Sequence, residues 1–256
     1  MLCLVLDLTT PLFFWRILVF YNPTSVMSVG VMMLLGCIPS TALLVIWALR
    51  DELAALLNRL RMAALGRLIE TLARLIDRII VPLGWVALAF AFGVCAYTVF
   101  LISALIRFPF INTAVLPALF VASGVSAGTA AAKLAAAAFF GEPRHSRVMH
   151  LLHRAEWPIM AAEAAFIFMI GMAMLFGYAG AKASAAAFVS GVWAAVFWIG
   201  AVGAGFGVPI LTGLLVKEDR AWCFWASGLA SVAGMMCLRL FILYAGQGNP
   251  VMLVPV

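Results

Sequence analysis

Charged residues are scarce in this chain. Asp, Glu, Lys and Arg together make up 10% of its 256 residues, whereas 66% are hydrophobic and the mean hydropathy is +1.16. Ordinary soluble domains carry about 25% charged residues, so this composition excludes a soluble fold and indicates a protein built for lipid. The few charges are unbalanced, with 16 basic against 10 acidic residues. The basic loops of a membrane protein account for this excess without a nucleic-acid partner.

Histidine and cysteine, the usual ligands of redox metals, are also rare. The three histidines, His145, His150 and His153, fall in one segment that we interpret as a solvated loop, and no predicted span supplies a haem-binding histidine. The five cysteines show no Cys-x-x-Cys spacing, which disfavours zinc and iron–sulfur ligation: Cys3, Cys37, Cys95, Cys223 and Cys237. We therefore expect no haem, no iron–sulfur cluster and no other redox metal in this chain. A Gly-rich phosphate loop and a nucleophile elbow are absent from the sequence as well.

Long apolar runs are abundant. Spanning a bilayer takes about 20 mostly apolar residues in a helix, and six runs are long enough: residues 24–50, 81–106, 113–140, 156–180, 187–214 and 224–247. The alternation expected of barrel strands is missing. The sequence predicts an all-α fold, a polytopic transmembrane helical bundle that forms a single membrane domain over residues 1–256.

Basic residues gather in alternate loops. Six arginines lie in the segment 50–80, three in the segment 141–155, and Lys217 and Arg220 lie near 215–222, whereas the opposite side carries Arg16, Arg107 and Lys182. The positive-inside rule places the arginine-rich loops in the cytoplasm. We therefore predict a multi-pass protein of a bacterial or archaeal cytoplasmic membrane.

The segment 51–80 also has leucines and isoleucines at helical spacing between its arginines. This pattern predicts an amphipathic helix on the cytoplasmic membrane surface. Attraction to anionic lipid explains it more simply than a docking surface for a partner does, although both interpretations remain open.

Two ionisable residues fall inside predicted spans, where charges are costly and usually functional. Lys133 lies about seven residues before the end of one span, and Glu163 about seven residues after the start of the next. In an antiparallel hairpin these equal offsets place both groups at one depth, so we predict that they pair. The pair is either a proton relay or a structural salt bridge.

Three stretches resemble the polysulfide reductase membrane-subunit (NrfD-like) family. Residues 97–128 hold an Arg-Phe-Pro-Phe-Ile-Asn elbow followed by Leu-Pro-Ala-Leu-Phe-Val-Ala-Ser-Gly, residues 4–30 hold Leu-Asp-Leu-Thr-Thr-Pro and Asn-Pro-Thr-Ser-Val-Met-Ser, and residues 239–246 hold an arginine, aliphatic residues and a glycine. In the family, the N-terminal stretch follows further helices. The resemblance therefore suggests that Met1 lies inside a former helix, which would leave an N-terminal partial helix of a truncated chain.

The resemblance implies a membrane anchor and quinone-binding subunit of a multi-subunit oxidoreductase. Such a subunit would pass electrons between menaquinone or ubiquinone and a ferredoxin-like iron–sulfur subunit, with a molybdopterin or cytochrome catalytic subunit beyond it. A quinone needs an apolar slot and donors for its carbonyl oxygens. The candidate quinone-binding residues on the side opposite the basic loops are Asp7, Asn22, Ser25, Tyr97, Asn112 and Arg239.

Structural roles compete with several of these assignments. Tyr97 is also an interfacial aromatic anchor by type, and Asn22, Ser25 and Asn112 stand where helix caps are expected. Two other protein classes remain open. A secondary transporter would also carry intramembrane charges, whereas a purely structural anchor would have no need for Asp7, Tyr97 and Arg239 together.

Overall fold

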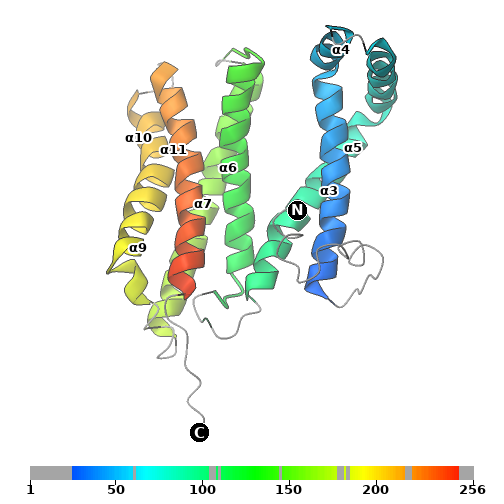
Figure 1. The fold of residues 1–256 in the computed structure, drawn as a ribbon. Coiled ribbons are helices and arrows are strands. Elements are labelled where there is room, and N and C mark those ends of the chain that lie inside the picture. The colour runs from blue at the N-terminus through cyan, green and yellow to red at the C-terminus, as the bar shows by residue number, and fades with distance from the viewer. Residues whose placement is uncertain are drawn as a thin grey trace. The chain divides into compact units, whose positions relative to one another are not determined.

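The computed structural model describes residues 25–59, 62–103, 108, 111–143, 146–177, 182, 185–216 and 221–247 (Figure 1). These residues are overwhelmingly helical and include no strand. The predicted N-terminal partial helix, together with Asp7 and Asn22, lies outside the described residues. The described chain falls into two compact units that meet at Thr98 and Val99.

Among the described residues, six helices are long and apolar enough to cross a membrane, as the hydropathy of the sequence predicts. Their bounds are Val26–Ala48, Leu65–Ser103, Leu116–Phe139, Arg147–Phe176, Val192–Leu214 and Trp222–Ala245. The polytopic all-α fold is therefore confirmed. Two helices are longer than the apolar runs that predicted them, and both extend on the side of the basic segments. A helix can continue past the apolar run because its backbone hydrogen bonds are made within the helix itself.

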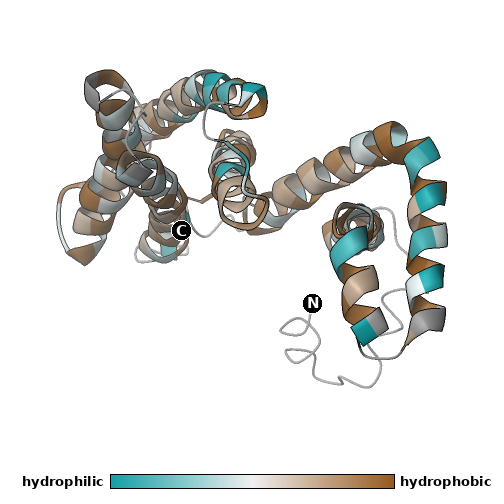
Figure 2. Ribbon diagram, turned by 90° about the horizontal axis from the view of Figure 1, so that it is seen from above, coloured by the Kyte–Doolittle hydropathy of each residue, from teal (hydrophilic) through white to brown (hydrophobic). Residues whose placement is uncertain are grey.

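Unit 1 contains α3 (Val26–Ala48), α4 (Arg50–Arg59) and most of α5 (Ala63–Ser103). The helix predicted over 51–80 is divided between α4 and the first part of α5, which runs without a break into the second span. Hydrophilic residues are concentrated along α4 and the start of α5 (Figure 2). The Asp77 carboxylate accepts from the Trp47 indole at 2.6 Å and from Arg50 at 3.3 Å, which ties α5 to the end of α3. Location on a membrane surface stays a prediction.

Helices α3 and α5 approach each other through glycines that face aromatic rings. A side chain at Gly30 would overlap the ring of Tyr97, and one at Gly36 would overlap the ring of Phe90. Each ring thus occupies the space that a glycine leaves free. Small residues are the usual means of close helix approach in lipid, where the hydrophobic effect does not drive helices together.

Unit 2 is a bundle of four spans. The first two are α6 (Leu116–Phe139) and α7 (Arg147–Phe176). The third is built from α9 (Val192–Ala195), π-helical η3 (Val196–Gly207), α10 (Val208–Leu211) and π-helical η4 (Thr212–Val216). The fourth joins α11 (Ala221–Leu240) to π-helical η5 (Phe241–Ala245). Close backbone contacts link α7 to α6, α6 to α11, and α11 to η3.

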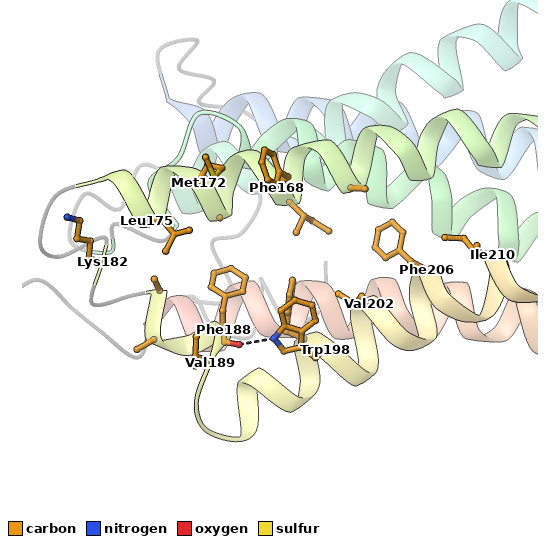
Figure 3. Close-up of a pocket in the computed structure, with 16 residues that line it drawn as sticks. Phe168, Met172, Leu175, Lys182, Phe188, Val189, Trp198, Val202, Phe206 and Ile210 are labelled. Atoms are coloured by element: carbon orange, nitrogen blue, oxygen red, sulfur yellow. Dashed lines mark hydrogen bonds between the residues drawn. The ribbon is translucent and has the colours of Figure 1, made fainter.

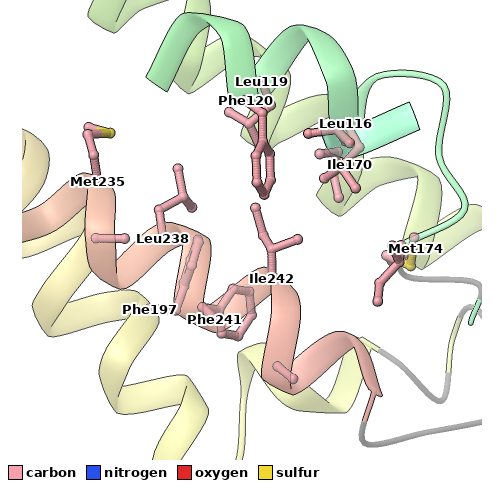
Figure 4. Packing of buried hydrophobic residues seen from close by; sticks show 14 residues of the cluster. Leu116, Leu119, Phe120, Ile170, Met174, Phe197, Met235, Leu238, Phe241 and Ile242 are labelled. Carbon is pink, nitrogen blue, oxygen red and sulfur yellow. The ribbon is translucent and has the colours of Figure 1, made fainter. Parts of the chain in front are cut away.

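Apolar side chains from all four spans form the core of unit 2. Leu119 of α6, Phe197 of η3 and Leu238 of α11 lie in this cluster (Figure 4). Helices α11 and η3 approach each other closely at Gly234 and Gly205, where a side chain on Gly234 would overlap the Gly205 backbone. The polar residues described next lie beside this core.

Candidate functional site

Three ionisable side chains are buried between α6 and α7 of unit 2. Lys133 is 4% exposed, Glu156 4% and Glu163 0%. The ammonium of Lys133 donates to Oε2 of Glu156 at 2.5 Å. Charges are expensive in a bilayer unless they are paired, so this contact explains how two of the three groups are tolerated.

The predicted pairing of Lys133 with Glu163 is therefore wrong. Counting from the apolar run placed the start of the helix at residue 156, but α7 begins nine residues earlier, at Arg147. Lys133 lies six residues before the last residue of α6, Glu156 nine residues into α7 and Glu163 sixteen residues into it. Glu156 therefore lies at the depth of Lys133. A cap marks this start, because the Ser146 hydroxyl accepts from the Met149 amide at 3.3 Å.

Glu156 also has a histidine beside it. Nδ1 of His153 lies 3.5 Å from the same Oε2 of Glu156, and the His153 side chain is 30% exposed. His150 and His153 belong to α7 and not to a loop, which corrects the sequence prediction, while His145 lies outside the described residues. In the described part of the chain, no three His, Cys, Asp or Glu side chains gather as a metal site would require.

Glu163 is in a different environment. Within the described residues, neither of its carboxyl oxygens has a hydrogen-bond partner of acceptable geometry. The Ser126 hydroxyl and the Arg239 guanidinium interact electrostatically with this carboxyl. A fully buried carboxyl without a good hydrogen bond is costly, and such groups are concentrated where proteins perform chemistry.

Arg239 reaches from α11 to α6. Its guanidinium donates to the Phe120 carbonyl at 3.3 Å and to the Ser123 hydroxyl at 3.5 Å, and it lies 5.4 Å from the centre of the Phe120 ring. Its Nε is buried and has no partner among the described residues. The predicted role of Arg239 at a quinone stays a prediction.

These groups follow one another through unit 2 from the exposed edge inward, and we call them the polar file. Ser126 precedes Lys133 by seven residues on α6, and Glu163 follows Glu156 by seven on α7, so each step covers about 10 Å along one helix face. Such a distance requires water molecules or side-chain movement for a proton to pass. The members of the polar file are His153, Glu156, Lys133, Glu163, Ser126, Ser123 and Arg239.

The predicted quinone-binding residues that the structure describes are distributed over both units. In unit 1, Ser25 stands at the cap position of α3 without a side-chain capping bond, and half-buried Tyr97 lies against Gly30, little more than a turn along α3. In unit 2, Asn112 is exposed. It does not cap α6, because Val115 stands at that cap position.

An apolar groove in unit 2 was not indicated by any pattern in the sequence. It has a volume of about 800 Å³ and lies between α7 and the span that contains η3 (Figure 3). Phe168 and Met172 line one wall, Trp198 and Phe206 the other, and Lys182 stands at one end. The Trp198 indole donates to the Phe188 carbonyl at 2.9 Å, which holds this end of the groove in shape.

The family model and the similar proteins found by comparison all belong to the polysulfide reductase and NrfD group. A family model described as polysulphide reductase, NrfD matches residues 1–250. The C chain of polysulfide reductase from Wolinella succinogenes is 34% identical over 252 residues, which cover 96% of this protein and 77% of that one. Protein NrfD homolog of Haemophilus influenzae is 35% identical over 251 residues, covering 95% and 76%. Protein NrfD of Escherichia coli is 36% identical over 261 residues, covering 96% and 78%. No solved structure matches the chain significantly.

Proposed function

The chain belongs to the polysulphide reductase, NrfD family, and on that premise we propose that it is the quinone-binding membrane anchor of a respiratory oxidoreductase. It passes electrons between the quinone pool and a ferredoxin-like iron–sulfur subunit. A catalytic subunit of the molybdopterin or cytochrome type lies beyond that partner. The observation that supports this function best is the polar file, because an inert anchor gains nothing from buried ionisable groups.

Donor chemistry in unit 1 fits a quinone. The Tyr97 hydroxyl and the Ser25 hydroxyl lie near the same end of α3, and both donate hydrogen bonds of the kind that carbonyl oxygens accept. We assign these two side chains to holding and orienting the quinone. When bound, the quinone supplies two-electron chemistry coupled to the uptake or release of protons.

Protons for that chemistry need a route through the bundle, and the polar file has the features of one. The His153 side chain is 30% exposed, so water can reach it, and histidine commonly serves as a proton shuttle. Glu156 and Lys133 form the next step, and Glu163 the one after it. Chains of Asp, Glu and His side chains are the usual proton relays in membrane proteins.

The orientation follows from charge. Arg147 and Arg154 lie at the His153 end of α7, so the positive-inside rule places this end in the cytoplasm of a bacterial or archaeal cell. The iron–sulfur partner then docks on the opposite face, and protons enter the polar file from the cytoplasm.

Two substitutions test the proposal in the complete complex, reconstituted into vesicles with a pH indicator inside. Tyr97→Phe keeps the ring against Gly30 but removes the hydroxyl, and loss of one hydrogen bond of about 1–2 kcal/mol lowers quinone turnover roughly tenfold. The matched control is Tyr244→Phe, because Tyr244 is exposed and stacked on Trp193. Unchanged turnover in Tyr97→Phe at normal assembly removes Tyr97 from the quinone site.

For the proton route, Glu163→Gln keeps the shape of the side chain but removes its ability to carry a proton. We expect quinone-linked proton uptake to fall roughly a hundredfold, which is typical of losing a proton carrier. The control is Glu70→Gln at an exposed position of α5. Equal proton uptake in the two variants contradicts the relay.

A further inference from the structure

The bundle of unit 2 is incomplete on one side. Three of its neighbouring helix pairs, α7 with α6, α6 with α11, and α11 with η3, have their backbones in close contact. The fourth pair, α7 and η3, is separated by the groove of about 800 Å³. A space of this size in a membrane protein is filled by something, because an apolar wall does not hold water and an empty groove forfeits packing.

The length of the groove indicates what fills it. On α7 the wall extends from Ala164 to Leu175, which is about 16 Å at 1.5 Å per residue, and on the facing span it extends from Phe197 to Ile210, about 20 Å by the same rise. Half of the hydrocarbon core of a bilayer is about 15 Å. Both walls are shorter than the full hydrocarbon core of about 30 Å, which a partner's transmembrane helix would need, and they are closer to the depth of the acyl chains of one leaflet.

The chemistry of the groove distinguishes a phospholipid from a quinone. Its walls are apolar and aromatic, apart from Lys182 at one end and the Trp198 indole (Figure 3). The indole N–H already donates to the Phe188 carbonyl, so the walls offer no donor to a quinone oxygen at the depth where a ring would lie. The exposed Lys182 stands beyond the end of α7, at the interfacial end, and there it complements a negatively charged headgroup.

We propose that the groove between α7 and η3 is a binding site for an anionic phospholipid of the leaflet on the Lys182 side. Its acyl chains lie along Phe168, Met172 and Phe206, and its phosphate pairs with Lys182. The bound lipid completes the helix bundle beside the polar file. This proposal depends on the membrane location of the chain and not on the proposed electron transfer.

Photocrosslinking tests the site. The purified complex is placed in phosphatidylcholine nanodiscs that contain a small share of phosphatidylglycerol with a photoactivatable acyl chain. Crosslinks are mapped by mass spectrometry and are expected on the groove walls of α7 and η3. Gly171 lines the groove, and a side chain added there meets open space, so Gly171→Phe fills the groove without a backbone clash. Groove crosslinks should disappear in this variant.

The matched control is Gly128→Phe on α6, where an added side chain also meets open space but does not enter the groove. Ala164→Phe fills the deep end of the groove and replaces Gly171→Phe if that protein fails to assemble. Unchanged groove crosslinks in a well-assembled filling variant overturn the proposal. So does labelling of the groove by a photoactivatable quinone, or by a partner subunit, in place of the phospholipid.

The headgroup is tested with Lys182→Gln. One lysine near a membrane surface favours an anionic lipid by about fivefold. Groove crosslinking by phosphatidylglycerol should therefore exceed that by a matched phosphatidylcholine probe by about this factor in the natural protein, and the two should be equal in Lys182→Gln. Arg154→Gln, at the other end of α7, should keep the preference. Equal crosslinking by both probes in the natural protein overturns the assignment of Lys182 to the phosphate.

Discussion

Removing either member of the Lys133–Glu156 pair should destabilise the protein more than removing both. The two atoms in contact are 2.5 Å apart, and each side chain is 5% exposed. At an effective dielectric constant of about 20, two charges at this separation attract by roughly 7 kcal/mol, which is opposed by the cost of taking both out of water. Breaking such a pair from one side typically costs about 3–5 kcal/mol, because it leaves an uncompensated charge in the bundle.

The variants are Lys133→Met, Glu156→Gln and the double mutant, all close in volume to the natural side chains. For a protein of this size, about 2–4 °C of melting temperature corresponds to 1 kcal/mol. Each single change should therefore lower the apparent melting temperature in detergent by roughly 6–20 °C. The double mutant should melt within a few degrees of the natural protein, because both charges are gone.

A second cycle with Glu163 serves as the control. Lys133 does not hydrogen-bond or pair with Glu163, so the effects of Lys133→Met and Glu163→Gln should add to within about 0.5 kcal/mol. The assay is a scan at fixed heating rate with the fraction of folded protein followed by size-exclusion fluorescence. Additive effects in the Lys133–Glu156 cycle, or strong coupling in the Lys133–Glu163 cycle, would refute the helix register described here.

Two further changes test the packing of each unit separately. Gly234→Ala should destabilise unit 2 by about 1–3 kcal/mol, because the new methyl group overlaps the Gly205 backbone. The control Gly128→Ala places its methyl group in open space and should be neutral or stabilising. Melting temperatures in detergent distinguish the two variants. Asp77→Asn should cost at most about 1 kcal/mol, because the Asp77 side chain is 45% exposed and solvent screens its ion pair. Asp77→Ala removes both side-chain oxygens, so the Trp47 indole loses its acceptor. The quenching of Trp47 fluorescence by a water-soluble quencher should increase in Asp77→Ala, and an unchanged Trp47 signal would contradict the contact.

Local sequence patterns were sufficient for the membrane class, the six spans of the described residues and the family. A run of about 20 apolar residues has no stable place but the bilayer, and the backbone must then be helical. The elbow before Asn112 and the ending that opens at Arg239 are short stretches of neighbouring residues, so their order could be recognised without any tertiary contact.

The partner of Lys133 could not be obtained in this way. Hydropathy locates the apolar part of a helix but not its first residue, and α7 begins at Arg147, well before its apolar run. The depth of a side chain is counted from the helix start. Because the start was placed nine residues too late, the sequence predicted Glu163 as the partner of Lys133, whereas the structure shows Glu156. The serine at position 146, a common capping residue, was the local signal that could have revealed the earlier start.

The sequence by itself determined that this protein is a helical membrane protein of a known family with six spans in its described part, because burial in lipid is decided one segment at a time. The tertiary structure decided which buried charges meet, which glycines admit a neighbouring backbone, and that a groove separates α7 from η3. Each of these depends on the rotation and depth of one helix against another. Side-chain packing over the whole bundle sets those quantities, and no single segment encodes them.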